Sequence, residues 1–291
     1  MSAIKSWTIP GAAGELIFGN GHLPAGRPEG VVLIAHGFKG YKDYGMFPRL
    51  ARHSAESGFI AHRFNFSHSG MTNNLETFER PDLFECDTWN TQVHDFQTVI
   101  RAVAAGDLDG SGLPYVMFGH SRGGVTALLT AGRMAGDETI PQPSGVITAA
   151  SPSRCSSFSE AESRQLLSDG YLISPSARTG QELRIGKAFL QEQLEDPEGH
   201  DLRALVGKIT CPLLLVHGEV DPTVPVQCTG EIAAAARQAK TLVIAGADHV
   251  YNTPNPMPDT AAPSEQLQQL LDALSDFARR CCQSGSVPSG T

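Results

Sequence analysis

Short apolar runs recur along the chain, and longer segments with helical periodicity separate them. Eight of these runs have the length of a β-strand, and the later ones are continuously apolar, which is typical of parallel strands buried on both faces. The predicted strands are 5–9, 15–19, 31–36, 59–64, 115–119, 145–150, 213–217 and 241–245. The first two are close enough in sequence to form an antiparallel hairpin around residues 11–14.

Four segments between or after these runs have amphipathic helical patterns: 88–105, 125–135, 230–240 and 264–279. In the first of them, Val93, Phe96 and Ile100 recur at helical spacing, and Gly106 follows as a stop signal. Helices that alternate with buried strands predict an α/β fold, in which helices cover both faces of a mostly parallel eight-stranded sheet.

Two segments interrupt the alternation. Residues 69–87 are predicted to be a polar loop. Residues 152–210 are too long for a structureless connection inside a compact domain. Within them the sequence predicts a helix at 159–168, a hairpin at 171–185 that turns at Thr179-Gly180, and a helix at 186–194.

This pattern predicts the domain organisation. We expect residues 152–210 to form an inserted cap over the strand ends. Residues 1–151 and 211–282 would form the core. The Ser/Gly/Pro-rich tail, 283–291, is expected to be disordered.

The composition, with 41% apolar and 18% charged residues among 291, is ordinary for a soluble globular protein. The net charge of −9, with no cluster of Lys and Arg, argues against a nucleic-acid partner. The longest apolar runs are strand-sized, so no membrane span is expected, and residues 1–20 make a poor signal peptide. Six scattered cysteines without a C-x-x-C pair are typical of reduced thiols, so we expect a cytoplasmic protein.

Residues 119–123 read Gly-His-Ser-Arg-Gly and lie between a predicted strand and a helix-forming stretch. A serine at the centre of G-x-S-x-G in this setting is the pattern of a nucleophile elbow. Gly119 and Gly123 fit it, because side chains there would collide with the neighbouring strand and helix. The alternative is an ordinary turn whose serine caps the helix, and the pentapeptide alone does not decide between them.

An acid and a base follow Ser121 in the sequence. Asp221 comes shortly after the predicted strand 213–217, and His249 comes shortly after 241–245. The carboxyl ends of parallel strands share one edge of the sheet, so we expect the three side chains to meet there. An imidazole can then take the serine proton, and a carboxylate can hold the imidazole in the required tautomer.

Asp221 has two competing interpretations. It precedes Pro222, so it could be a turn aspartate, and Asp248 is a second carboxylate next to His249. We favour Asp221 because of its place after a core strand, and we expect Asp248 to contact backbone.

The order Ser121, Asp221, His249, with a His36-Gly37-Phe38 turn after the third strand, resembles the serine carboxylesterases of the α/β-hydrolase superfamily. The nearest resemblance is to capped bacterial cinnamoyl (feruloyl) esterases, over about residues 31–278. It implies an oxyanion hole made by the backbone amides of Phe38 and Arg122, the latter at a helix N-terminus. It also implies acyl-enzyme chemistry with water as the final acceptor and without a metal or organic cofactor.

Other side chains near the predicted site have two interpretations each. The Arg122 side chain could bind a substrate carboxylate or phosphate, or it could be exposed to solvent. An apolar acyl pocket or core packing would each explain five aromatic residues, and core packing is the better explanation for Phe64. These are Phe64, Phe66, Phe78, Phe84 and Trp89.

Histidines end three of the predicted strands. We expect His36, His120 and His217 to be buried and hydrogen-bonded rather than catalytic. The histidines show no metal-binding spacing such as H-x-x-x-H or H-E-x-x-H, so no metal site is predicted.

The sequence therefore predicts a carboxylic-ester hydrolase whose partners are a small-molecule ester, small or aromatic, and water. A serine peptidase, a thioesterase or a carbon–carbon hydrolase would use the same machinery. A non-catalytic small-molecule receptor is the alternative from a different class. The acyl and alcohol preference and the oligomeric state do not follow from the sequence.

Overall fold

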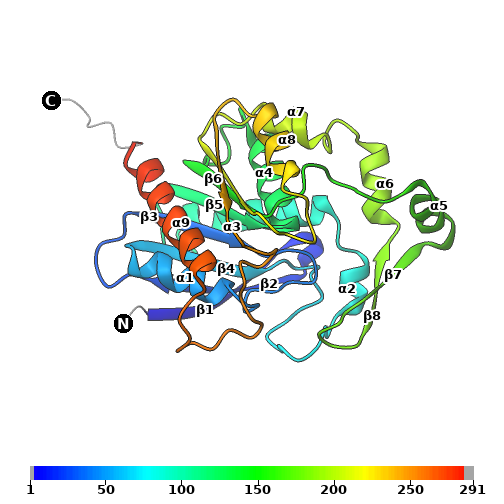
Figure 1. The fold of residues 1–291 in the computed structure, drawn as a ribbon, viewed down its shortest axis with the longest axis horizontal. Coiled ribbons are helices and arrows are strands. Elements are labelled where there is room, and N and C mark those ends of the chain that lie inside the picture. The colour runs from blue at the N-terminus through cyan, green and yellow to red at the C-terminus, as the bar shows by residue number, and fades with distance from the viewer. Residues whose placement is uncertain (1–2, 285–291) are drawn as a thin grey trace.

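An eight-stranded sheet runs through the middle of the computed structural model, which describes residues 3–284 (Figure 1). Its strand order is β1-β2-β4-β3-β5-β6-β9-β10. The strands are β1 (Ala3–Pro10), β2 (Leu16–Leu23), β3 (Gly30–Ala35), β4 (Phe59–Asn65), β5 (Tyr115–His120), β6 (Gly145–Ala149), β9 (Leu213–Gly218) and β10 (Ala239–Ile244). From β4 to β10 all pairs are parallel, whereas β1 and β2 form the predicted antiparallel hairpin. The predicted α/β fold class and all eight strands are confirmed.

Helices cover both faces of the sheet because successive residues of a strand point to opposite sides. Val32 and Ile34 of β3 pack with α1 (Phe47–Glu56) and α9 (Glu265–Ser284). Leu33 belongs to the core on the other face, with α3 (Trp89–Ala105), α4 (Arg122–Met134) and α8 (Gln227–Ala235). Each face of the sheet therefore has its own apolar core, as strands buried on both sides require.

Three helices differ from the prediction. The helix expected at 230–240 ends at Ala235, because the chain from Ala239 onward pairs with β9 and extends β10. The polar loop expected at 69–87 contains the short helix α2 (Pro81–Glu85), which buries Phe84. No helix was expected at α1, where Pro48 lies in the first turn, a position that tolerates proline.

The inserted segment has its own small sheet. Residues 152–210 contain α5 (Glu160–Asp169), β7 (Tyr171–Pro175), β8 (Glu182–Gly186), α6 (Ala188–Glu195) and α7 (Leu202–Val206). β7 and β8 form the predicted hairpin and do not join the main sheet. Figure 1 shows α5, α6, β7 and β8 grouped at the right of the core. In contrast, α7 packs on α4 so closely that a Cβ at Gly132 would lie 2.7 Å from the Leu205 carbonyl oxygen.

The division into a core and an inserted cap stays a prediction. Of the predicted disordered tail, residues 283 and 284 belong to α9, which corrects that boundary. Residues 285–291 lie outside the described part of the chain.

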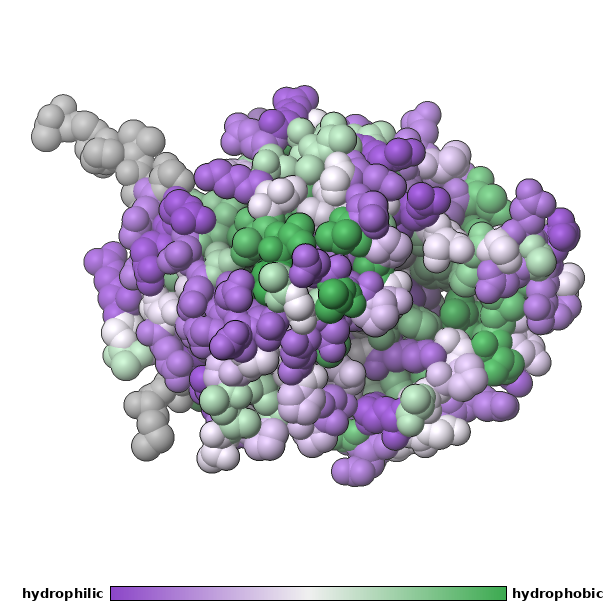
Figure 2. All heavy atoms as spheres, viewed as in Figure 1, coloured by the Kyte–Doolittle hydropathy of each residue, from purple (hydrophilic) through white to green (hydrophobic). Residues whose placement is uncertain are grey.

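The surface in Figure 2 is largely polar, with apolar residues gathered over the centre and at the right of the view. The described residues expose few large apolar side chains, among them Val220 and Val243. Within residues 3–284, no helix has the length and hydropathy needed to cross a bilayer.

A buried carboxylate on α3 joins three segments that are distant in sequence. Asp95 is fully buried and accepts hydrogen bonds of 2.7 Å from the amides of Ala12, between β1 and β2, and of Ser67, just after β4. The Ser67 hydroxyl also donates to it at 2.8 Å. Burial raises the pKa of Asp95 to about 6, although these hydrogen bonds oppose the rise.

We expect Asp95→Asn to change how stability depends on pH. The pKa of Asp95 lies above the ordinary value of 3.8, so the folded protein holds this proton more tightly than the unfolded chain. The charged form therefore costs the wild type stability as the pH rises from about 4 to about 6. Urea unfolding between pH 4 and 7 should show that the free energy of unfolding falls by roughly 2–3 kcal/mol more in the wild type than in the variant.

Asp272→Asn, at an exposed position on α9, controls for the loss of one charge. If the difference between the wild type and Asp95→Asn were the same at every pH, the buried carboxylate would not be the titrating group.

Candidate active site

The turn from β5 into α4 holds Ser121 in a backbone conformation that side-chain-bearing residues rarely adopt. Its φ is 54° and its ψ is −123°. A Cβ at Gly119 would lie 2.1 Å from the Gly123 carbonyl oxygen, and a Cβ at Gly123 would lie 2.4 Å from that of His36. Both positions therefore require glycine, and the turn has the geometry of a nucleophile elbow.

Ser121, His249 and Asp221 meet beyond the carboxyl ends of β5, β9 and β10. The Nε2 atom of His249 lies 3.1 Å from Ser121 Oγ, and its Nδ1 atom lies 2.8 Å from Asp221 Oδ2. When Nδ1–H donates to the carboxylate, Nε2 is left to accept the serine proton. This is the arrangement that a general base for Ser121 needs.

The Asp221 carboxylate is fully buried and has several donors. Its Oδ1 atom accepts the amides of Thr223 (2.8 Å) and Val224 (2.9 Å), and His217 Nε2 lies 3.3 Å from Oδ2. Burial opposes ionisation, but hydrogen bonds from His217, His249 and the two amides hold the pKa of Asp221 well below its ordinary value. The carboxylate is thus ionised at neutral pH. Sequence reasoning missed His217 as a partner of Asp221.

Asp248 has no part in this arrangement. Its Oδ1 atom accepts the backbone amides of Val250 (2.9 Å) and Asn252 (2.7 Å), as expected for a carboxylate that contacts backbone.

The turn after β3 lies directly beside the elbow. A Cβ added to Gly37 would be 3.0 Å from the Cβ of Ser121. Phe38 is the next residue and lines the cavity above the serine. His36 fixes this turn, because its Nδ1–H donates to the Gly37 carbonyl oxygen (2.8 Å) and its Nε2 accepts the Phe66 amide (3.4 Å). The Arg122 amide is in the first turn of α4, where amides lack partners within the helix. The roles of Phe38 and Arg122 as oxyanion donors stay a prediction.

His120 supports the loop that carries His249. Its Nε2–H donates to the His249 carbonyl oxygen at 2.8 Å, and the two rings lie 4.8 Å apart. Burial lowers the pKa of His120 to about 3 and that of His36 to about 4. Both rings are therefore neutral at neutral pH, as expected for buried, hydrogen-bonded histidines.

The Arg122 side chain is buried, so the interpretation that it is exposed to solvent was wrong, whereas a contact with a substrate carboxylate or phosphate stays a prediction. The side chain is 10% exposed, and its Nη2 atom lies 3.2 Å from Asp87 Oδ2. The guanidinium is also 4.8 Å from the Trp89 ring and 4.7 Å from the Phe189 ring of α6. It therefore joins the elbow to α3 and to α6 of the inserted segment.

The five candidate aromatic residues form no acyl pocket around Ser121. All are buried, and none lines the cavity above the serine. Phe64, Phe66 and Trp89 belong to the main core, whereas Phe78 and Phe84 pack with Tyr41 and Leu183.

A cavity of about 310 Å³ opens above Ser121. Its walls come from turn 37–40, from the His249 loop, and from residues 175–178, at the end of β7 and in the turn toward β8. Sequence reasoning gave no role to Lys39 or to residues 175–178. Lys39 lay in a turn already singled out, but only the fold brings the hairpin to the site.

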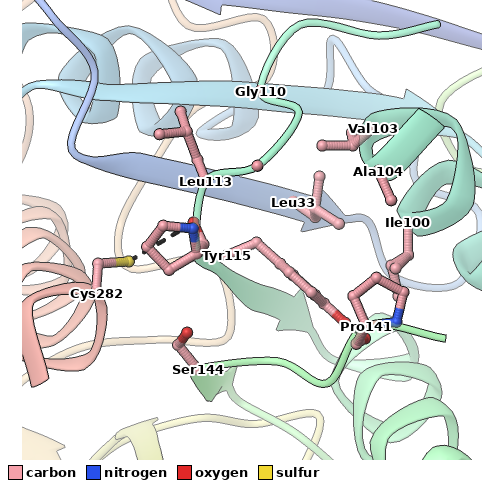
Figure 3. Close-up of a pocket in the computed structure, with 12 residues that line it drawn as sticks. Leu33, Ile100, Val103, Ala104, Gly110, Leu113, Tyr115, Pro141, Ser144 and Cys282 are labelled. Atoms are coloured by element: carbon pink, nitrogen blue, oxygen red, sulfur yellow. Dashed lines mark hydrogen bonds between the residues drawn. The ribbon is translucent and has the colours of Figure 1, made fainter. Parts of the chain in front are cut away.

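A second cavity, of about 630 Å³, lies at the opposite, amino-terminal end of the strands (Figure 3). Tyr115, at the start of β5, crosses it and donates to the Pro141 carbonyl oxygen at 2.6 Å, while Cys282 of α9 lies on another wall. The described residues that line it include no histidine and no charged side chain.

Comparisons with known proteins agree with this architecture. The structure is similar to the esterase domain of a Rhodothermus marinus protein, with 22% identity, a TM-score of 0.64, and 96% of this chain and 98% of that chain covered. It is also similar to Est1E from Butyrivibrio proteoclasticus with bound ferulic acid (18%, TM-score 0.66, 93% and 97% covered). A dienelactone hydrolase from Anabaena variabilis is similar as well (15%, TM-score 0.61, 95% and 96% covered).

A search of curated proteins found no significant match. Residues 31–262, most of the chain, match the model of the Alpha/beta hydrolase family. The resemblance of the sequence motifs to the α/β-hydrolase superfamily is thereby confirmed, and the chain belongs to the alpha/beta hydrolase family.

Proposed function

We propose that the protein is a serine carboxylesterase, which hydrolyses esters through an acyl-enzyme intermediate on Ser121. The observation that carries this proposal is the pair of hydrogen bonds at His249, 3.1 Å to Ser121 Oγ and 2.8 Å to Asp221 Oδ2. Membership of the family supports hydrolysis. Similarity to an esterase domain and to Est1E favours esters among the substrates that the same machinery could serve.

In the first half of the reaction, Ser121 Oγ attacks the ester carbonyl carbon while His249 Nε2 accepts the hydroxyl proton. The negative charge that develops on the carbonyl oxygen is stabilised by the amides of Phe38 and Arg122. The bond to the alkoxy group then breaks, and the His249 imidazolium gives its proton to the departing alcohol. Asp221, ionised and buried, stabilises the imidazolium while it exists.

In the second half, a water molecule takes the place of the alcohol. His249 accepts a proton from this water, which attacks the acyl carbon and forms a second oxyanion between the same amides. The bond to Ser121 Oγ breaks, the serine recovers its proton from His249, and the carboxylic acid leaves. No step requires a further co-reactant.

Ser121→Ala is expected to abolish labelling by a fluorophosphonate probe and to lower kcat for p-nitrophenyl esters by about 10⁴-fold or more, because the nucleophile is lost. Gel fluorescence and ester kinetics measure the two effects. Ser144→Ala, in the opposite cavity, is the matched control and should be labelled like the wild type.

Labelling that persists in Ser121→Ala would contradict the assignment of the nucleophile. A folded wild type that neither reacts with the probe nor cleaves esters would favour a small-molecule receptor. Turnover of aminoacyl anilides far above that of esters would favour a peptidase.

Asp221→Asn is expected to lower kcat by about 10³–10⁴-fold with a smaller effect on KM, because an amide does not hold His249 in the right tautomer. Asp248→Asn removes the other nearby carboxylate, which contacts only backbone amides among the described residues, and serves as the control. Steady-state kinetics on one p-nitrophenyl ester compares them. An equal loss of kcat in the two variants would show that the Asp221 carboxylate has no specific role in the reaction.

A further inference from the structure

Two cationic side chains line the cavity above Ser121. Lys39 comes from the turn after β3, and Arg178 comes from the turn between β7 and β8. The described residues that line this cavity include no Asp or Glu. Because the whole chain carries a net charge of −9, the walls of this cavity have the opposite sign to the protein as a whole. A cleft lined by one sign of charge concentrates ligands of the other sign.

Neither cation is neutralised by a carboxylate. Within residues 3–284, no Asp or Glu oxygen lies within 4.0 Å of Lys39 Nζ or of the Arg178 guanidinium, whereas Arg184, on the same hairpin, pairs with Glu85. Lys39 Nζ donates to the Pro175 carbonyl oxygen at 2.6 Å, and Arg178 Nη1 donates to the Leu75 carbonyl oxygen at 2.6 Å. An ammonium has three donors and a guanidinium has five, so both groups keep N–H donors for a ligand.

Arg178 is already ordered without a ligand. Its guanidinium carbon lies 4.7 Å from the Tyr41 ring and 5.2 Å from the Phe78 ring, and Nη2 lies 3.3 Å from Met71 Sδ. These contacts restrict the side chain, so the binding of an anion to it costs little additional conformational entropy. A planar guanidinium also matches the geometry of a carboxylate.

Lys39 occupies a position that favours other residues. Its φ is 55°, in the left-handed region that glycine and asparagine adopt more readily than lysine. It directly follows Phe38, a predicted oxyanion donor. Its ammonium is partly buried, and this burial lowers its pKa. A lysine at a strained position beside the nucleophile indicates a use for its charge.

We propose that Lys39 and Arg178 form an anion site in this cavity, which selects esters that carry a second, ionised carboxylate. The inference rests on the proposed function, since it names the substrate class of the same site. Hydrolysis at Ser121 would then release either a dicarboxylate or a carboxylate-bearing alcohol, depending on which part of the ester carries the charge.

Matched ester pairs test the preference. On the acyl side, mono-p-nitrophenyl glutarate is compared with p-nitrophenyl valerate; on the alcohol side, 3-carboxy-4-nitrophenyl acetate is compared with 4-nitrophenyl acetate. We expect the wild-type kcat/KM to be at least about tenfold higher for the carboxylate member of one pair, because charge-assisted hydrogen bonds contribute at this level. Added 0.5 M salt should reduce the ratio.

Variants assign the preference to the two cations. Arg178→Gln and Lys39→Asn are each expected to lower the ratio about three- to tenfold, whereas Arg178→Lys should keep part of it. Asparagine suits the backbone of position 39 and removes the ammonium together with its hydrogen bond to Pro175. Arg164→Gln, on the exposed face of α5, is the matched control and should leave the ratio unchanged.

The anion site can also be tested without turnover. Calorimetry should detect glutarate binding to Ser121→Ala, and binding about tenfold weaker when Arg178→Gln is added. A wild-type ratio near one for both pairs, a ratio unaffected by either substitution, or no binding of glutarate would each overturn the inference. If the neutral esters are cleaved through Ser121 without a preference, the proposed function stands and this inference fails. If no ester is cleaved but glutarate binds through Arg178, the anion site stands, whereas the proposed function and the ester preference both fail.

Discussion

At the turn from β5 into α4, backbone segments pack too closely to leave room for a side chain. This packing determines where the rest of the site must lie. Ser121 keeps a φ of 54° because Gly119 faces the carbonyl of Gly123, and Gly123 faces that of His36. The same packing sets the end of β3, and the turn that follows it, against the serine. Once this turn is made, the loops after β9 and β10 need only reach one point in space, since parallel strands already end along the same edge.

Neutral, buried groups around the site keep the few charged ones in place. His120 and His36 donate to backbone carbonyls of the two loops that flank Ser121, and their lowered pKa values leave them uncharged. A second imidazolium beside His249 would oppose its protonation during a reaction. The Asp221 carboxylate therefore supplies the negative charge beside the His249 imidazole. The amides of Thr223 and Val224 offset the cost of burying this charge.

The sheet could be predicted because strands buried on both faces are apolar throughout, and the three site residues could be grouped because they follow such strands. Predictions from local sequence patterns were wrong where contacts between distant segments determine the structure. The alanine-rich end of α8 favours helix, but pairing with β9 extends β10 into the region expected to be helical. Pro48 and polar neighbours obscured the apolar face of α1. The surroundings of Arg122 could not be read from its own segment, because Asp87 and Phe189 approach it from different elements.

The cap hairpin forms a two-stranded sheet of its own, with no ladder to the main sheet, and yet its turn supplies one wall of the cavity above Ser121. The elbow and the eight-stranded sheet make no demand on the side chains at the tip of this ribbon. Substitutions at the tip of this ribbon can therefore reshape one wall of the cavity while the hydrogen-bond ladders of the main sheet and the turn that holds Ser121 stay as they are.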